Sequence, residues 1–267
     1  MRAMLKLSGI LLTCCFALLT GCSAKHVDWE NQGAPAGTGF LTKSFEFDGE
    51  TRNYTVFVPW SYNAQNPQKY PVIMFLHGVL EGGSNGRKCV TVGLGPAVSE
   101  RERTFPFFAV FPQSGSDWVG EKKMALAIAT LDQVLKDYPG ADRDRVSVTG
   151  LSNGGDGTWK IAARYPDRFA AIVPMCSSVD YDDVPALTKI PIWCFHNSVD
   201  PFRSSGRAAS MCRRIKEAGG NVQYTEYGTF GHNCWEQAFS DDEVFKWLLN
   251  QRRNSGAATT PGGAAVP

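Results

Sequence analysis

The chain lacks a strong charge of either sign and is poor in histidine. Its 267 residues include 27 Lys and Arg, 26 Asp and Glu and only 4 His, which gives a formal net charge of +1 at pH 7. A balance this close to zero offers no electrostatic footprint for nucleic acid or for an acidic membrane surface. We therefore expect neither as a partner, and a catalytic histidine has to be sought among few positions.

Several sequence signatures are also absent. We find no internal repeat, no phosphate-binding loop, no nucleotide fingerprint and no cluster with the spacing of metal ligands. After residue 21 no stretch is long and apolar enough to span a bilayer. We therefore expect no cofactor and no metal. The length of the chain fits one α/β domain better than two.

The N-terminus is typical of an export signal. Two basic residues precede the apolar stretch 9–19, and small residues follow it. The sequence LTGC (19–22) resembles the lipobox of bacterial lipoproteins, which implies that residues 1–21 are removed and that Cys22 becomes a lipidated N-terminus. Ordinary secretion with cleavage nearby is the alternative. In the first case we expect an exported protein that meets the membrane only through this lipid anchor.

The flanking segments have the composition of linkers. Residues 22–39, which end in NQGAPAGTG, predict a flexible tether. Residues 253–267, rich in Gly, Ala and Pro, predict a disordered tail. One folded domain is then expected over residues 40–252.

The cysteines of this domain are odd in number. They are Cys89, Cys176, Cys194, Cys212 and Cys234, so at most two disulfides and one free thiol are possible. Cys176 and Cys194 fall in predicted buried strands, where packing as small apolar groups is the expected role. Cys234 stands apart because it lies two residues from His232.

Within the domain, predicted strands and helices alternate. A hairpin around Asp48-Gly49 comes first. Apolar and β-branched runs then predict strands over 71–78, 107–112, 144–150, 169–177, 190–197 and 222–228. Helical spacing predicts helices over 122–138, 158–169 and 205–218, and a last helix with a capping box of Ser240 and Glu243. This alternation indicates an α/β fold with a mostly parallel sheet and helices on both faces.

The stretch VTGLSNGGDGTW (148–159) places Ser152 between two glycines, where a predicted strand meets a predicted helix. The pattern G-x-S-x-G is weak alone, and the strand–turn–helix context gives it meaning. A serine at the tip of such a turn lies beside the N–H groups of a helix N-terminus, which suits a nucleophile. The alternative is a Gly-rich turn in which the serine has no chemical role.

A serine nucleophile needs a histidine as its base. In this class of fold the acid and then the histidine follow the nucleophile along the chain. His26 lies in the tether, His77 precedes Ser152, and His196 precedes any acid in the loop beyond it. His232, in a Gly-containing loop after the last predicted strand, is therefore the candidate base.

The acid is expected at the carboxyl end of a neighbouring strand. Asp200 lies directly beyond the predicted strand 190–197, and Asp180, beyond the preceding strand, is the runner-up. In a triad of this kind the histidine removes the serine proton, and the carboxylate fixes the imidazole tautomer.

Residues 40–252 resemble the bacterial α/β-hydrolase esterases related to feruloyl and acetyl-xylan esterases, polyhydroxybutyrate depolymerases and prolyl-oligopeptidase-type hydrolases. The matching stretches are 75–86, 144–159, 164–178, 190–201 and 227–239. The resemblance implies an α/β-hydrolase catalytic domain with the triad Ser152, Asp200 and His232. It also implies an oxyanion hole formed by the backbone N–H groups of Val79 and Asn153.

Three positions depart from the family pattern. Asn197 replaces a glycine, Asn153 stands where methionine is frequent, and Cys234 stands where serine is common. None of these changes removes a catalytic atom. A disulfide at Cys234 would stiffen the loop of His232.

The resemblance implies a serine hydrolase that cleaves carboxylic esters through an acyl-enzyme. Only about a dozen residues separate the predicted strands 169–177 and 190–197, too few for a large lid domain. The open cleft expected from this suits bulky or polysaccharide-linked acyl esters. A serine peptidase of the prolyl-oligopeptidase type and a non-catalytic binding lipoprotein on the same fold are the alternatives. The sequence leaves the oligomeric state open.

Overall fold

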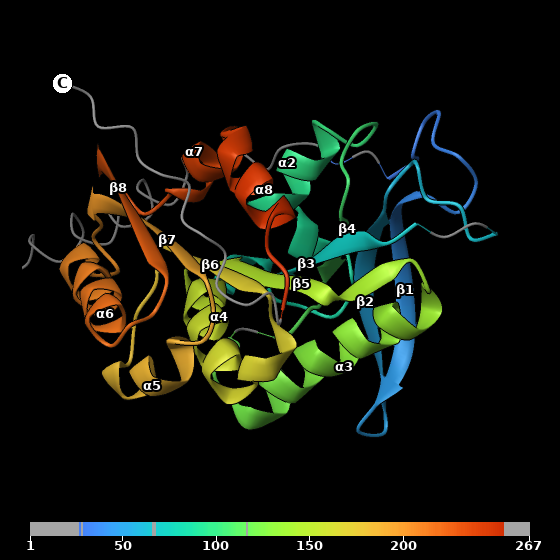
Figure 1. Cartoon of the computed structure of the whole chain (residues 1–267). Helices are drawn as coiled ribbons and strands as arrows, with labels where there is room; N and C mark the ends of the chain where they lie inside the picture. Colours follow the sequence, from blue (N-terminus) through green and yellow to red (C-terminus); the bar gives the residue numbers. More distant parts are fainter. Residues whose placement is uncertain (1–26, 28, 66–67, 116, 254–267) are drawn as a thin grey trace, which may run out of the picture.

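The structure, a computed structural model, describes residue 27 and residues 29–65, 68–115 and 117–253 (Figure 1). The predicted signal segment 1–21, the predicted lipidation site Cys22 and all of the predicted tail except residue 253 lie outside these residues. Within the part of the chain that the structure describes, no helix has the length and hydropathy needed to cross a membrane.

One eight-stranded sheet forms the middle layer, with the strand order β1-β2-β4-β3-β5-β6-β7-β8. The strands are β1 Gly39–Phe47, β2 Glu50–Val58, β3 Tyr70–Leu76, β4 Phe108–Phe111, β5 Ala141–Leu151, β6 Ala171–Met175, β7 Ile192–Val199 and β8 Val222–Phe230. The hairpin β1–β2 and the pair β2–β4 are antiparallel, and all other neighbours are parallel. The mostly parallel sheet is therefore confirmed.

Helices cover both faces of this sheet (Figure 1). They are α2 Leu94–Ser99, α3 Glu121–Asp137, α4 Asn153–Arg164, α5 Val184–Leu187, α6 Ser205–Glu217, α7 Trp235–Ser240 and α8 Asp242–Leu249, with the short 3-10 helices η1 Val79–Glu81, η2 Lys88–Val90, η3 Pro166–Arg168 and η4 Tyr181–Asp183. One core packs α3, α4, α5 and α6 on the sheet, and a second packs α2, α7 and α8 on the opposite face. The two cores make the central strands apolar on both sides, as β3 shows by being buried at every residue.

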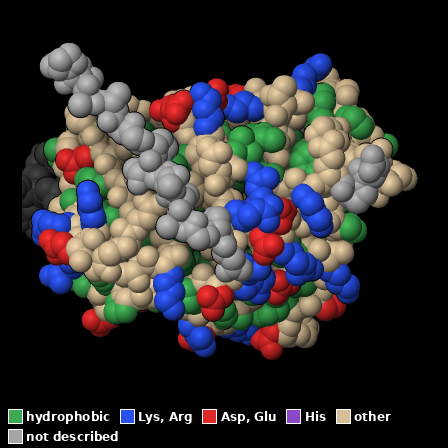
Figure 2. Space-filling view, viewed as in Figure 1, with side chains coloured by type: hydrophobic (Ala, Val, Ile, Leu, Met, Phe, Trp, Pro, Cys, Tyr) green, Lys and Arg blue, Asp and Glu red, His purple; other side chains and the backbone are tan. Residues whose placement is uncertain are grey.

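The surface carries mixed charge. On the face drawn in Figure 2, Lys and Arg side chains are intermixed with Asp and Glu. Ion pairs of the described residues include Arg252 with Asp142 at 2.8 Å and Arg253 with Asp144 at 2.7 Å. This intermixing matches a net charge near zero.

The described part of the N-terminal segment 22–39 makes contacts that a flexible tether is not expected to make. In the described part of 22–39, Val27 is buried, and the side-chain amide of Asn31 bonds the backbone N–H and C=O of Phe40 at 2.6 and 3.0 Å. The Trp29 ring lies 6.1 Å from that of Phe40. The Gly- and Pro-rich composition gave no sign of these contacts, which hold the segment against β1.

The last helix also differs from its prediction. Two helices, α7 and α8, occur where one was expected, and Ser240 ends α7 rather than capping α8. Asp241 caps α8, because its carboxylate accepts the N–H of Glu243 at 2.9 Å.

Candidate active site

Ser152 lies between β5 and α4, at the carboxyl edge of the sheet. Its φ of 53° and ψ of −120° are unusual for a residue other than glycine. The serine N–H donates to the carbonyl of Met175 at 3.0 Å, which fixes the turn to the neighbouring strand. A Cβ atom on Gly154 would lie 1.8 Å from the carbonyl oxygen of Leu76. Only glycine therefore lets the helix start this close to β3.

The loop after β3 lies against the end of β5. A Cβ atom on Gly78 would be 2.8 Å from a methyl carbon of Leu151, the residue before Ser152. Val79 follows as the first residue of η1, and its side chain is about half exposed. Asn153 is the first residue of α4, and the first turn of a helix directs N–H groups outward from its end. Both predicted oxyanion donors thus belong to helices that begin at this edge.

His77 is buried and holds this loop through both ring nitrogens. Its Nε2 accepts the backbone N–H of Ser114 at 3.1 Å, so the proton belongs on Nδ1, which donates to the Gly78 carbonyl at 2.7 Å. Burial lowers the pKa of His77 to about 4, which keeps the ring neutral. Because a trans peptide sets C=O and N–H on opposite sides, the bond to Gly78 turns the N–H of Val79 away from His77.

Asp200 and His232 form a short hydrogen bond between the loops that follow β7 and β8. His232 Nδ1 donates to Asp200 Oδ2 at 2.7 Å, and the carboxylate side chain has no exposed surface. The backbone N–H groups of Phe202 and Arg203 donate to Oδ1 at 2.8 and 3.1 Å. Burial raises the pKa of Asp200, but the hydrogen bonds from His232 and Phe202 outweigh it and hold that pKa below its usual value.

Asp180, the runner-up acid, is placed elsewhere. Its carboxylate is half exposed and accepts Lys160 Nζ at 2.8 Å. The structure brings Asp200, and not this residue, to His232.

A disulfide connects the two sides of the site. Cys176, directly after β6, is bonded to Cys234, two residues after His232. The expectation that Cys176 is a packing residue is therefore wrong, since sequence spacing does not show that residues 58 positions apart meet. The residue before Cys176 accepts the N–H of Ser152, so the bond links the loop of His232 to the support of the serine turn.

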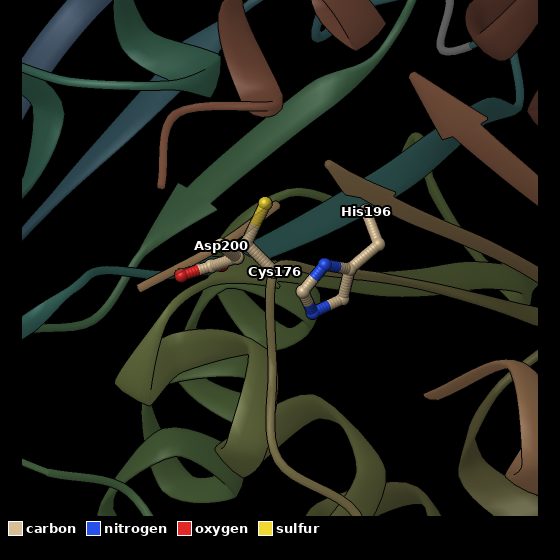
Figure 3. A group of neighbouring side chains, drawn as sticks. All are labelled: Cys176, His196 and Asp200. Atoms are coloured by element: carbon tan, nitrogen blue, oxygen red, sulfur yellow. The ribbon is translucent and has the colours of Figure 1, made fainter. Parts of the chain in front are cut away.

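Asp200 also belongs to a group of three side chains that carry possible metal-ligand atoms. One donor atom each of Cys176, His196 and Asp200 lie within 4.8 Å of one another, and Figure 3 shows the three side chains side by side. The sulfur of Cys176 is bonded to Cys234, and the carboxylate of Asp200 accepts from His232. Two of the three donors are thus already engaged, and the group does not fit a metal centre.

The sequence prediction missed a charged pair beside the serine. Arg203 Nη2 donates to Asn153 Oδ1 at 2.7 Å and to Asp156 Oδ2 at 3.0 Å. Arg203 lies three residues after Asp200, and Asp156 lies four after Ser152. Polar residues this close to two candidate catalytic positions were the available signal.

Comparisons by sequence find remote relatives, and no family model matches the chain. The chain is 27% identical over 144 residues to an uncharacterized secreted protein of Arthroderma benhamiae, covering 51% of this chain and 14% of that protein. It is 27% identical over 208 residues to a bifunctional acetylxylan esterase/xylanase of Neocallimastix patriciarum, covering 72% of this chain and 29% of that protein. The chain thus spans less than a third of these curated relatives.

Comparisons by structure find closer likenesses. A thermostable esterase matches with a TM-score of 0.73 and 31% identity, over 80% of this chain and 63% of the other. A ferulic acid esterase matches with a TM-score of 0.61 and 19% identity, over 78% of this chain and 95% of the other. An acylaminoacyl peptidase of Pyrococcus horikoshii matches with a TM-score of 0.63 and 14% identity, over 84% of this chain and 44% of the other. The fold is that of the α/β-hydrolases.

Proposed function

We propose that this chain is a serine hydrolase that cleaves carboxylic esters through an acyl-enzyme, with Ser152 as nucleophile, His232 as base and Asp200 as acid. The observation that carries the proposal is the 2.7 Å bond from His232 Nδ1 to the buried carboxylate of Asp200, at the same sheet edge as a serine held at positive φ. The thermostable esterase neighbour, at 31% identity, supports the same reading.

The reaction follows from these positions. With Nδ1 bonded to Asp200, Nε2 of His232 is the atom that takes the Ser152 proton while Oγ attacks the ester carbon. The oxyanion forms at the backbone N–H groups of Val79 and Asn153. Collapse of this intermediate breaks the ester C–O bond, and His232 returns the proton to the leaving alcohol. Water then attacks the acyl-enzyme with the same histidine as base, which frees the acid and restores Ser152.

The surroundings of the site favour bulky acyl esters, including esters linked to polysaccharide. The connection from β6 to β7 contains only η4 and the four-residue helix α5, so no lid domain is inserted there. Val79 and Leu80 are 51% and 53% exposed, and the exposed Phe202 ring lies 5.3 Å from that of His232. These apolar side chains offer contact area to a large acyl group. The acetylxylan esterase and ferulic acid esterase among the similar proteins agree with this class.

A serine peptidase is the second candidate, because acylaminoacyl peptidases are among the structural neighbours. The same three side chains serve amide hydrolysis, so substrates must separate the two functions. We expect residues 23–267 to hydrolyse p-nitrophenyl acetate and methyl ferulate and to leave a chromogenic peptide intact. Ser152→Ala is expected to remain folded with at least about a thousandfold less activity.

The outcomes of this experiment separate the three functions. Peptide cleavage without ester cleavage would favour the peptidase. Silence on all substrates, together with no labelling of Ser152 by a fluorophosphonate, would favour a binding protein on a hydrolase fold. Activity of Ser152→Ala within tenfold of the wild type would exclude the triad.

We further propose that the protein is exported and held at a membrane through a lipid on Cys22. The support is the LTGC sequence after an apolar segment. The Cys22→Ala variant is expected to leave the membrane fraction of expressing cells. Unchanged fractionation would contradict the anchor.

A further inference from the structure

Arg203 joins the two sides of the candidate site. Its guanidinium donates to Asn153 and Asp156 in the first turn of α4, directly after Ser152. Its backbone N–H donates to Oδ1 of Asp200 at 3.1 Å. One residue therefore connects the loop of the acid to the helix that follows the nucleophile.

Asp156, in the first turn of α4, is a second carboxylate at the candidate site. Its side chain is only 19% exposed, and it forms an ion pair with Arg203 at 3.0 Å. Burial raises the pKa of Asp156, while the N–H of Ser178 and the charges of Arg203 and His232 act in the opposite direction. Geometry links this carboxylate to the candidate base, because Arg203, its ion-pair partner, also donates its backbone N–H to the Asp200 carboxylate that accepts from His232.

The described titratable groups that interact electrostatically with His232 come from the loop of Asp200, from α4 and from β7. Asp200 bonds it directly, Asp156 approaches from α4 with Arg203 as its partner, and His196 approaches from β7. Burial lowers the pKa of His196, so this ring is neutral near pH 7. Two uncharged aromatic rings also contact it, with the ring centres of Phe202 and Trp235 at 5.3 and 5.5 Å from that of His232.

We propose that Arg203 and Asp156 act as a positioning pair that fixes the acid loop against α4 and cancels the charge of Asp156 at His232, and so sets the pH range in which this histidine works as a base. The role in turnover rests on the proposed function. The charge coupling itself is a property of the folded protein and can be measured without a substrate.

The coupling is tested by NMR titration of protein labelled with 13C-histidine, with His232 assigned by loss of its signal in His232→Asn. In Arg203→Met the unpaired carboxylate favours the imidazolium, and we expect the titration midpoint of His232 to rise by roughly 0.5 to 1 pH unit. In Asp156→Asn the unpaired guanidinium acts in reverse, and the midpoint falls. In the double variant both charges are gone, and the midpoint returns to within about 0.2 of the wild type.

The acidic limb of kcat/KM for p-nitrophenyl acetate is expected to move with these midpoints. Arg203→Lys keeps the charge but not the fork that reaches both Asn153 and Asp156. We therefore expect this variant to keep the wild-type midpoint and to lose roughly three- to tenfold in kcat with KM nearly unchanged. Arg213→Met and Glu217→Gln are the matched controls, because they break an exposed Arg–Glu pair on α6, and they should move neither quantity.

Unchanged midpoints in both charge-removing variants would overturn the proposal and leave the pair a structural contact. If Arg203→Met does not fold, Arg203→Lys and Asp156→Asn still decide, because they must differ in midpoint. If the variants shift the midpoint as expected but the wild-type protein hydrolyses no substrate, the proposed function is refuted and the charge coupling is retained. If ester hydrolysis depends on Ser152 but the variants leave the midpoint of His232 unchanged, the proposed function is supported and the charge coupling is refuted.

Discussion

The two sides of the candidate site are held by different forces. On the nucleophile side, close backbone packing and the neutral ring of His77 hold the turn of Ser152 and the loop of Val79. On the acid side, the bond between Asp200 and His232 is supported by the Arg203 ion pair and a disulfide. An atom added to a closely packed backbone clashes outright, whereas a change of charge or of redox state weakens a contact by a graded amount. The nucleophile side should therefore fail outright when changed, and the acid side should change by degrees.

The glycines show the same contrast. A Cβ atom on Gly154 or Gly150 would lie 1.8 or 2.3 Å from a backbone oxygen, while one on Gly228 or Gly231 would meet nothing within 4 Å. The first two flank the serine, and the last two precede His232. Crowding is thus confined to one side of the site.

The largest expected effect is that of Gly154→Ala. The new methyl group would meet the backbone carbonyls of Leu76 and His77 at 1.8 and 2.7 Å, so β3 and α4 would have to separate. We expect a loss of more than about 4 kcal/mol of stability, enough to leave little folded protein. Circular dichroism and soluble yield measure this. A folded Gly154→Ala variant with wild-type activity would contradict the steric account, and Ser152→Ala is the control for loss of activity without loss of fold.

The second effect is that of removing the disulfide with Cys176→Ala and Cys234→Ala together. Closing a loop between residues 58 positions apart constrains the unfolded chain, and the loop-entropy relation gives about 4 kcal/mol. The double variant should melt at a lower temperature and still turn over substrate, because no catalytic atom is lost. Reductant should lower the melting temperature of the wild type and leave that of the variant unchanged. Equal stability with and without reductant would contradict the prediction.

The disulfide illustrates where sequence reasoning ended. Apolar runs predicted the strands and main helices because burial on both faces leaves a continuous pattern in the sequence. The serine turn was visible because its glycines are local. Cys176 and Cys234 lie in different loops, and their contact depends on how β6 and β7 are placed in the sheet.

Two other differences have the same origin. Ser240 and Asp241 are adjacent residues that both suit a helix N-cap, and because α7 extends through Ser240, Asp241 is the residue that caps α8. The ion pair of Arg203 with Asp156 joins the loop of Asp200 to α4, which only the fold brings together. Local chemistry was thus predictable, and contacts across the sheet were not.

The third effect concerns pH and the nucleophile side. Burial lowers the pKa of His77 to about 4, from 6.5 in an unfolded chain, so between these values the unfolded state takes up a proton that the folded state refuses. The full contribution of His77 to the free energy of unfolding should be present above pH 6.5. That free energy should fall as the pH drops toward 4, by up to about 3 kcal/mol from this residue. Urea unfolding at pH 7.5 and pH 4.5 measures the loss.

His77→Asn separates this contribution from that of His196, whose burial acts in the same direction. The asparagine amide can still donate to the Gly78 carbonyl but has no proton to gain. The variant should be less stable at pH 7.5 and lose less stability on acidification than the wild type. An identical loss in both proteins would show that His77 does not set the pH dependence.

The smallest effect is expected for Gly228→Ala, on the side of the histidine. Nothing lies within 4 Å of the added Cβ atom, and Gly228 has no positive φ, so the methyl group enters solvent without strain. We expect a change in stability of at most about 0.5 kcal/mol and activity within twofold of the wild type. Melting temperature and kcat on one ester suffice to measure both. A loss as severe as that of Gly154→Ala would mean that the end of β8 before His232, too, is fixed by close packing, and the contrast between the two sides would then rest on charge alone.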